Sequence, residues 1–126
     1  MTLRRLLTNA RGATIVEFAL VAPIFIMVVV GGINLSMLGF SAASLRYATE
    51  AAARCAAVKT SVCSNVSTTQ AHASANFTKL SSAPATFAVT MNASCGKQVT
   101  GTLNYVAETG LGSFTVPLTT TSCFPQ

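Results

Sequence analysis

The sequence predicts an α+β fold, in which a long amino-terminal transmembrane helix continues into a small domain with a short helix and a three-stranded antiparallel sheet. Three patterns in the 126 residues support this fold class. An apolar run covers residues 15–40, a helical period of small apolar residues follows it, and a two-residue alternation begins after Pro84. These patterns divide the chain into a basic leader (1–12), a long helix (13–62) and a small disulfide-stapled domain (63–126).

The apolar run from Ile15 to Phe40 is long enough to cross a membrane, because it has 26 residues and a spanning helix needs ~20. Glu17 is the only charged residue in the run. A carboxylate in a bilayer is costly, so Glu17 requires a partner and marks a functional position. An ordinary secretory signal has an apolar core of only ~7–15 residues, so cleavage near residues 41–44 is a minor alternative.

Two features of the run predict how its helix packs. Pro23 removes an amide donor and predicts a bend near Ala19. Gly32, Ser36 and Gly39 recur four and three residues apart and form a stripe of small residues that a second helix can approach closely. Glycine is also simply common in membrane helices, so the stripe has two interpretations that the sequence leaves open.

The helix is expected to continue outside the membrane over residues 41–60. Small apolar residues keep a helical period there, and charged residues spaced four apart form a solvated face, on which Glu50 and Arg54 have the favourable order. The apolar positions are Leu45, Ala48, Ala52, Cys55, Val58 and Val62, and the charged positions are Arg46, Glu50 and Arg54.

Four cysteines follow the apolar run, Cys55, Cys63, Cys95 and Cys123, and predict two disulfides in an oxidising compartment. Eight residues of helix are ~12 Å long and a disulfide needs Cα atoms within ~7 Å. A Cys55–Cys63 bond therefore requires the helix to end near residues 58–60. A Cys95–Cys123 bond is favoured for the second pair, with Cys95 in a turn and Cys123 beyond the end of the middle strand.

No metal or other cofactor is expected. The sequence has no Cys-x-x-Cys, and its single histidine, His72, has no cysteine near it in the sequence, which argues against a zinc site. We interpret His72 as a surface residue.

The last 64 residues predict a short helix and then a sheet. The helix covers residues 68–80, with a capping box at Ser67-Thr68-Thr69-Gln70. Residues 86–92, 98–105 and 114–119 alternate between apolar and Thr-rich positions, which is typical of half-buried strands. Pro117 suits an edge strand. The simplest topology is an antiparallel meander whose apolar face packs on the long helix.

The start of the apolar run resembles the processing site of type IV pilins. A basic leader with Arg4, Arg5 and Arg11 precedes Gly12-Ala13-Thr14-Ile15-Val16-Glu17-Phe18. With Pro23 and the long apolar tail, the segment resembles more narrowly the TadE-like proteins of the tight-adherence (Tad/Flp) pilus system. The resemblance covers residues 11–54, less than half of the chain.

This resemblance implies a pilin-like fold and a pseudopilin or minor pilin. A prepilin peptidase would cut between Gly12 and Ala13, and Glu17 would pair with the free amine of a neighbouring subunit. The protein would be a single-pass protein of a bacterial inner membrane, with its carboxyl-terminal domain in the periplasm or carried in a cell-surface pilus for adhesion. Its partners would be the prepilin peptidase, other pilins or pseudopilins, and Tad inner-membrane assembly proteins.

Other functional classes fit the composition less well. The net charge is +5, but removal of the leader leaves five basic and three acidic side chains and no basic stripe for nucleic acid. The acids Glu17, Glu50 and Glu108 and one histidine form no catalytic set, so no enzyme is expected. Two alternatives stay open: an unprocessed, signal-anchored periplasmic binding or accessory protein that uses the Thr-rich sheet face, and a secreted disulfide-bonded domain.

Overall fold

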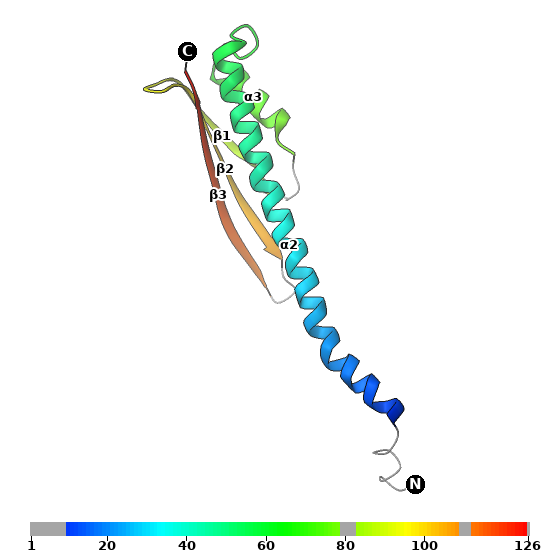
Figure 1. Ribbon diagram of the computed structural model, residues 1–126. Helices are drawn as coiled ribbons and strands as arrows, with labels where there is room; N and C mark the ends of the chain where they lie inside the picture. Colours follow the sequence, from blue (N-terminus) through cyan, green and yellow to red (C-terminus); the bar gives the residue numbers. More distant parts are fainter. Residues whose placement is uncertain (1–9, 79–82, 109–111, 126) are drawn as a thin grey trace. The chain divides into compact units, whose positions relative to one another are not determined.

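The computed structural model describes residues 10–78, 83–108 and 112–125, apart from the side chains of residues 10, 11 and 13. Its elements are α2 (Ala10–Val58), α3 (Val66–Asn76), β1 (Thr86–Ala93), β2 (Gly96–Glu108) and β3 (Ser113–Phe124) (Figure 1). The predicted α+β class, with a long apolar helix, a short helix and a three-stranded antiparallel sheet, is confirmed. Contacts divide the chain into two units, residues 1–35 and 36–126, which are described separately.

The described part of the first unit is the amino-terminal portion of α2. The helix runs through Pro23 without a break, although proline has no amide hydrogen to donate. Asn34, the polar residue in mid-run, donates from Nδ2 to the carbonyl oxygen of Val30 at 2.9 Å. Its amide group is thus hydrogen-bonded within its own helix.

In the second unit, α2 buries a face of small side chains. Leu45 is the only large aliphatic residue on it, and Ala48, Ala52 and Ala53 are also buried. Such short side chains let the helix lie close to the sheet. The charged face is solvated as predicted, but the ion pair joins Arg46 Nε to Glu50 Oε1 at 3.0 Å and not Glu50 to Arg54.

The apolar period of α2 ends earlier than the sequence predicted. Val58 and Val62 are 67% and 56% exposed, although the pattern placed them on the buried face. α2 ends at Val58, so Val62 lies outside the helix and no longer follows its period. Val58 is the last residue of the helix and lines an open cleft, not the core. The backbone then reverses through hydrogen bonds from Val62 N and Cys63 N to the carbonyl oxygen of Lys59.

The sheet is the predicted antiparallel meander, with the order β1-β2-β3. β2 pairs with β3 over twelve residues, from Lys97 opposite Phe124 to Glu108 opposite Ser113, while β1 pairs with the first half of β2. Pro117 lies in β3, an edge strand, where proline is tolerated. Figure 1 shows α2 and α3 over the same face of this sheet.

The core lies between the helices and that sheet face. Its buried cluster combines α2, α3 and both β1 and β2, and Phe77 packs edge-on against Phe87 with ring centroids 6.3 Å apart. The cluster consists of Leu45, Ala48, Ala52, Ala53, Ala73, Phe87, Val99 and Leu103.

Gly101 of β2 sets the distance between the sheet and α2. It is buried opposite Phe87, and a Cβ built on it would lie 2.7 Å from Thr49 Oγ1 and 3.1 Å from both Leu45 Cδ1 and Phe87 Cε1. A side chain at this position would force α2 away from β2. Glycine is therefore required here by close packing, and not by backbone conformation.

The bounds of α3 differ from the prediction. The helix covers Val66–Asn76 and not residues 68–80; residues 79–82 lie outside the described residues. The cap is Asn65, whose Oδ1 accepts from Thr68 N at 2.9 Å while Thr68 Oγ1 accepts from Asn65 N at 3.2 Å. Asparagine is among the best N-caps, so Asn65 starts the helix before Ser67, the residue that we predicted.

Among the described residues of the second unit, three polar side chains are buried, and each hydrogen-bonds to a backbone carbonyl four residues earlier. Ser41, Thr49 and Thr69 donate from their hydroxyls to the carbonyl oxygens of Met37, Leu45 and Asn65 at 2.7–2.9 Å. In the described part of the chain no buried side-chain nitrogen or oxygen lacks a partner. The core thus contains hydroxyl groups, but each of them is hydrogen-bonded, so their burial leaves no polar group unpaired.

Replacing Gly101 tests the close packing of α2 on β2. We expect Gly101→Ala to lower the free energy of unfolding of the second unit by about 1–3 kcal/mol, because the added methyl overpacks the contact with Thr49 and Leu45. The measurement is chemical denaturation of the full chain in detergent, followed by circular dichroism. Asn104→Ala, on the exposed face of the same strand, is the control. Equal stability of the two variants would contradict the packing argument.

Candidate functional sites on the apolar helix and around the disulfides

The apolar run is exposed on all sides of α2. The exposed large apolar side chains between Ile15 and Phe40 have exposed fractions from 41% at Met37 to 73% at Phe18. By length and composition α2 is able to cross a membrane, with a mean hydropathy of 2.4 in an 18-residue window, none of it buried. So large an apolar surface in water would be an aggregation site, whereas a bilayer covers it at no cost.

The predicted processing motif lies at the start of this helix. Gly12 is exposed and already helical, and Ala13 follows it in α2, its side chain outside the described residues. Glu17 is exposed one turn further on. Gly12 and Glu17 are thus both exposed and lie five residues apart near the start of α2.

The predicted packing residues lie on exposed parts of α2. Pro23, Gly32, Ser36 and Gly39 are all exposed, and a Cβ built on Gly32 or Gly39 would meet no atom within 4 Å. The glycines thus have no packing role within the single chain. This is the condition for contact with a second helix, but it holds equally for a lipid-facing surface.

The cysteines pair as the sequence analysis favoured. Cys55, in the last turn of α2, bonds to Cys63 with Cα atoms 5.8 Å apart. Both residues are buried, at 4% and 2% exposure, and form a second small core with Ala56 and the half-buried Met91. The bond closes the reversal after α2, two residues before the cap of α3 at Asn65.

The second disulfide joins Cys95 to Cys123, with Cα atoms 6.2 Å apart. Cys95 lies in the turn before β2, as predicted, but Cys123 lies within β3 opposite Gln98 and not beyond the end of β2. The close approach depends on Gly96, whose φ is +120° and where a Cβ would meet the carbonyl oxygen of Phe124. A residue with a side chain would push the end of β3 away from the turn.

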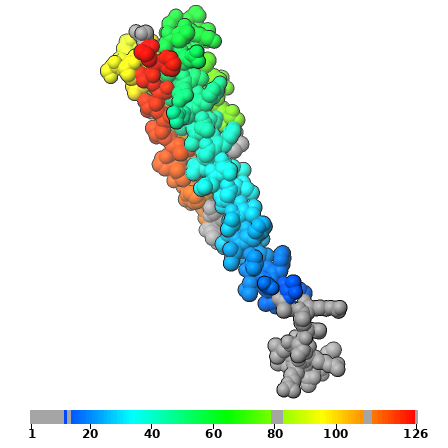
Figure 2. Space-filling view, in the orientation of Figure 1, coloured from blue at the N-terminus to red at the C-terminus, as the bar shows by residue number. Residues whose placement is uncertain are grey.

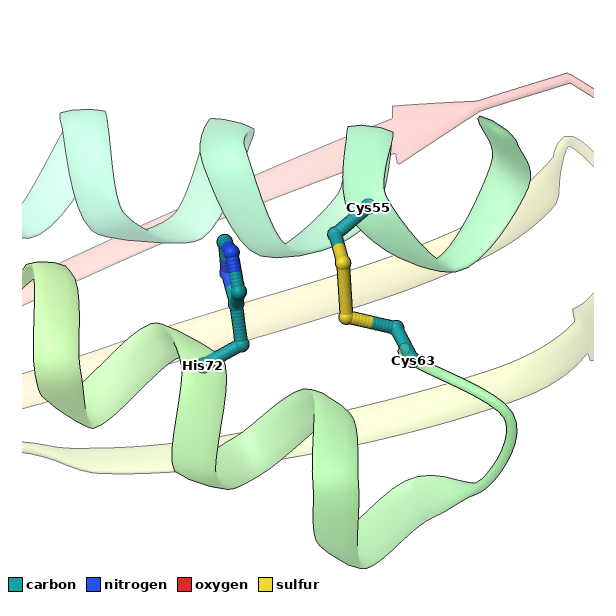
Figure 3. A group of neighbouring side chains, drawn as sticks. All are labelled: Cys55, Cys63 and His72. Atoms are coloured by element: carbon teal, nitrogen blue, oxygen red, sulfur yellow. A yellow bond between two sulfur atoms is a disulfide. The ribbon is translucent and has the colours of Figure 1, made fainter. Parts of the chain in front are cut away.

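His72 lies beside the first disulfide, contrary to the expectation of a surface residue with no cysteine near it. It is half-buried, and one ring nitrogen and the two sulfur atoms of Cys55 and Cys63 all lie within 4.8 Å of one another. Figure 3 shows the His72 side chain rising from α3 toward α2 next to the disulfide.

The helical period of α3 places His72 on its packed face. Thr69, His72, Ala73 and Asn76 are spaced three or four apart and share that face, and Thr69 and Ala73 are buried. Asn76 Nδ2 donates to the His72 carbonyl oxygen at 2.8 Å and lies 3.3 Å from His72 Nδ1. The approach of His72 to the cysteines depends on how α3 packs beside α2, which the sequence pattern does not report.

A cleft of about 580 Å³ opens next to this cluster. Figure 2 shows α2, in cyan and green, beside the orange and red β3 on the visible face of the second unit. The residues that line the cleft come from α2, its end, α3 and β3. They are Tyr47, Glu50, Ala51, Arg54, Cys55, Val58, Lys59, His72 and Phe124.

The outer face of the sheet carries the predicted threonines. Thr86 Oγ1 and Thr102 Oγ1 are 2.6 Å apart across β1 and β2, and Thr100 and Thr121 are joined in the same way across β2 and β3 at 3.1 Å. These hydroxyls therefore form hydrogen bonds with one another across the strands. The face is polar but uncharged over these rows.

Comparison with known proteins agrees with the resemblance at the start of the chain. The family model described as TadE-like protein matches residues 12–54 of this chain. The match begins at Gly12, includes Glu17 and ends one residue before Cys55. No curated protein and no solved structure matches the chain. The similarity to TadE-like proteins is thus shown for residues 12–54. The described residues among 55–126 are characterised by the structure alone.

The two disulfides should differ in their resistance to reduction. Cys55 and Cys63 are buried whereas Cys95 is exposed and Cys123 half-buried. We expect a thiol reductant to break Cys95–Cys123 first, since attack on the buried pair requires local opening, and ~1.4 kcal/mol of opening slows the reaction about tenfold. Alkylation followed by mass spectrometry measures both rates in one sample. Equal rates would show that the core around Cys55 opens freely.

Proposed function

We propose that this protein is a pseudopilin or minor pilin that takes part in the assembly of a Tad pilus, a type IV-like pilus. The observation that carries the proposal is the match of residues 12–54 to the TadE-like family model. It begins at the glycine of the processing motif and includes the whole apolar run. The role is structural, through packing of the helix, and no catalytic activity is assigned to the chain.

We place residues 15–40 in the bacterial inner membrane as a single-pass helix. The exposed apolar surface of α2 supports this placement, and an α-helix satisfies its backbone hydrogen bonds internally, as a bilayer requires. The two disulfides support a periplasmic location for residues 41–126, because such bonds persist in oxidising compartments. Incorporation into a cell-surface pilus that serves adhesion would keep the same topology.

Processing and pairing are assigned to the first turns of α2. A prepilin peptidase would cut between Gly12 and Ala13 and leave an ammonium group on Ala13. The exposed Glu17 would accept the ammonium of a neighbouring pilin or pseudopilin, since each charge offsets the desolvation of the other. Tad inner-membrane assembly proteins are the further partners of this route.

The alternative is an unprocessed, signal-anchored protein of the periplasm that binds or assists another component. The specific observation in its favour is the rows of threonine hydroxyls on the outer face of the sheet, which offers a polar surface away from the helices. In this case Gly12 would stay in the mature chain.

Release of a secreted domain by cleavage near residues 41–44 is less well supported. Ser41 is buried, and Ser44 Oγ accepts a hydrogen bond from Thr78 N at 2.9 Å. Both residues lie in α2, within the folded second unit. Cleavage there would remove residues of α2 that are packed or hydrogen-bonded within that unit.

The amino terminus tests the processing step directly. We expect the protein isolated from membranes that contain a prepilin peptidase to begin at Ala13, and the same protein without the peptidase to begin at Met1. Intact-mass measurement distinguishes the two. Gly12→Val should block the cut because the peptidase accepts a small residue there, while Gly39→Val serves as the matched control on the same helix. A peptidase-independent start at Met1 would contradict processing, and a start near Ser44 would favour release.

Replacing the carboxylate tests pairing separately from processing. We expect Glu17→Gln to be cut normally but to co-purify with its pilin or pseudopilin partners at least about tenfold less, since the neighbouring ammonium loses its counter-charge in a low-dielectric environment. Quantitative mass spectrometry of detergent-solubilised complexes gives this ratio. Glu50→Gln, on the solvated face of α2, controls for loss of a charge. Unchanged co-purification would contradict the pairing role.

A further inference from the structure

Cys55, Cys63 and His72 form a cluster of possible metal ligands, and the proposed pilus function assigns no role to it. Two cysteine sulfurs and one imidazole nitrogen lie within 4.8 Å of one another, and they come from the end of α2, the connection after it, and α3. Thiolate and imidazole are the ligands that Zn²⁺ prefers, and a site with three protein ligands leaves a fourth position for water.

We propose that the reduced form of this protein binds one Zn²⁺ through Cys55 Sγ, Cys63 Sγ and a ring nitrogen of His72. The disulfide and the metal are then alternative cross-links at the same place. The disulfide joins the end of α2 to the connection after it, whereas zinc would also include α3. This inference does not depend on the pilus function proposed above.

The spacing of the three residues suits a tetrahedral ion. Zn–S bonds are ~2.3 Å and Zn–N bonds ~2.0–2.1 Å long, which sets ligand atoms roughly 3.5–3.8 Å apart around the metal. The ligand atoms already lie within 4.8 Å. Cys63 lies in an irregular connection and not in a helix, so its sulfur can separate from Cys55 after reduction without unwinding α2 or α3.

The surroundings provide both burial and access. Cys55 and Cys63 are buried, which keeps competing water from most of the site, while Cys55 and His72 line the cleft of about 580 Å³ through which an ion and a water ligand can enter. Arg54 and Lys59 line the same cleft, together with Glu50. Two thiolates would cancel the charge of a bound Zn²⁺, so these cations would not oppose the complex.

The chemistry balances with a named reductant. A trialkylphosphine breaks the Cys55–Cys63 bond and is oxidised to its phosphine oxide with the oxygen of one water, whose two hydrogens appear on the two thiols. Binding of Zn²⁺ then releases two protons as the thiols become thiolates. Neutral imidazole binds without a further proton being lost.

The test is Zn²⁺ titration of the full chain in detergent, fully reduced by trialkylphosphine, with Co²⁺ as a spectroscopic probe of tetrahedral thiolate coordination. We expect one ion per reduced chain and none per oxidised chain. Cys95→Ser/Cys123→Ser should keep the site, and Cys55→Ser/Cys63→Ser should lose it. The chain has a single histidine, and His72→Ala should weaken binding by at least the roughly 10–100-fold that loss of an outer-shell partner costs.

Two outcomes would overturn the proposal: binding that survives in Cys55→Ser/Cys63→Ser, or an affinity that His72→Ala leaves unchanged. A second measurement needs no variant and so remains decisive if a variant fails to fold. In the reduced wild-type chain, Zn²⁺ should protect Cys55 and Cys63 from alkylation and leave Cys95 and Cys123 reactive. The opposite pattern would place the metal at the other pair and exclude the site at His72.

Discussion

The contact between α2 and β2 at Gly101 is the constraint on which the second unit depends. With no side chain at this position, Thr49 and Leu45 come into van der Waals contact with the strand. Alanines at 48, 52 and 53 continue the same narrow interface along the helix. A small unit gains little from its few large apolar residues, so it relies on close approach to exclude water.

The two disulfides add covalent links to a unit whose core is small. Cys55–Cys63 closes the reversal between α2 and α3, and Cys95–Cys123 ties the turn before β2 to the end of β3. The first bond lies in a small buried cluster with Ala56, against which Met91 packs. In a domain of this size such staples replace apolar area that the chain does not have.

The apolar side chains of α2 are exposed in its first part and buried in its last part. In residues 15–40 the apolar side chains face outward around the helix, as in a bilayer, whereas from Ser41 onward the apolar face of α2 is buried and the charged face is solvated. The family match crosses this change, because it covers residues 12–54. The similarity therefore includes the apolar run and the first part of the packed helix but not the sheet.

Many features of this protein are determined by residues close together in the chain, so the sequence alone predicts them. The apolar run, the end of α2 before Cys63, the meander after Pro84 and the motif at Gly12 and Glu17 all depend on residues close together in the chain, whose periods and spacings can be read directly. The start of α3 is also local: the sequence pattern predicts Ser67 as the cap, whereas the structure has Asn65 there.

Only the tertiary structure decided which distant residues meet. Gly101 lies in a strand with an alternating apolar pattern. Only the contact with Thr49 and Leu45 shows that this position has no room for a side chain. His72 is nine residues from Cys63 and seventeen from Cys55, and it joins them only because the chain reverses after Val58 and α3 returns beside α2. Sequence patterns report which face of an element is buried, whereas contacts between elements depend on how those faces are packed.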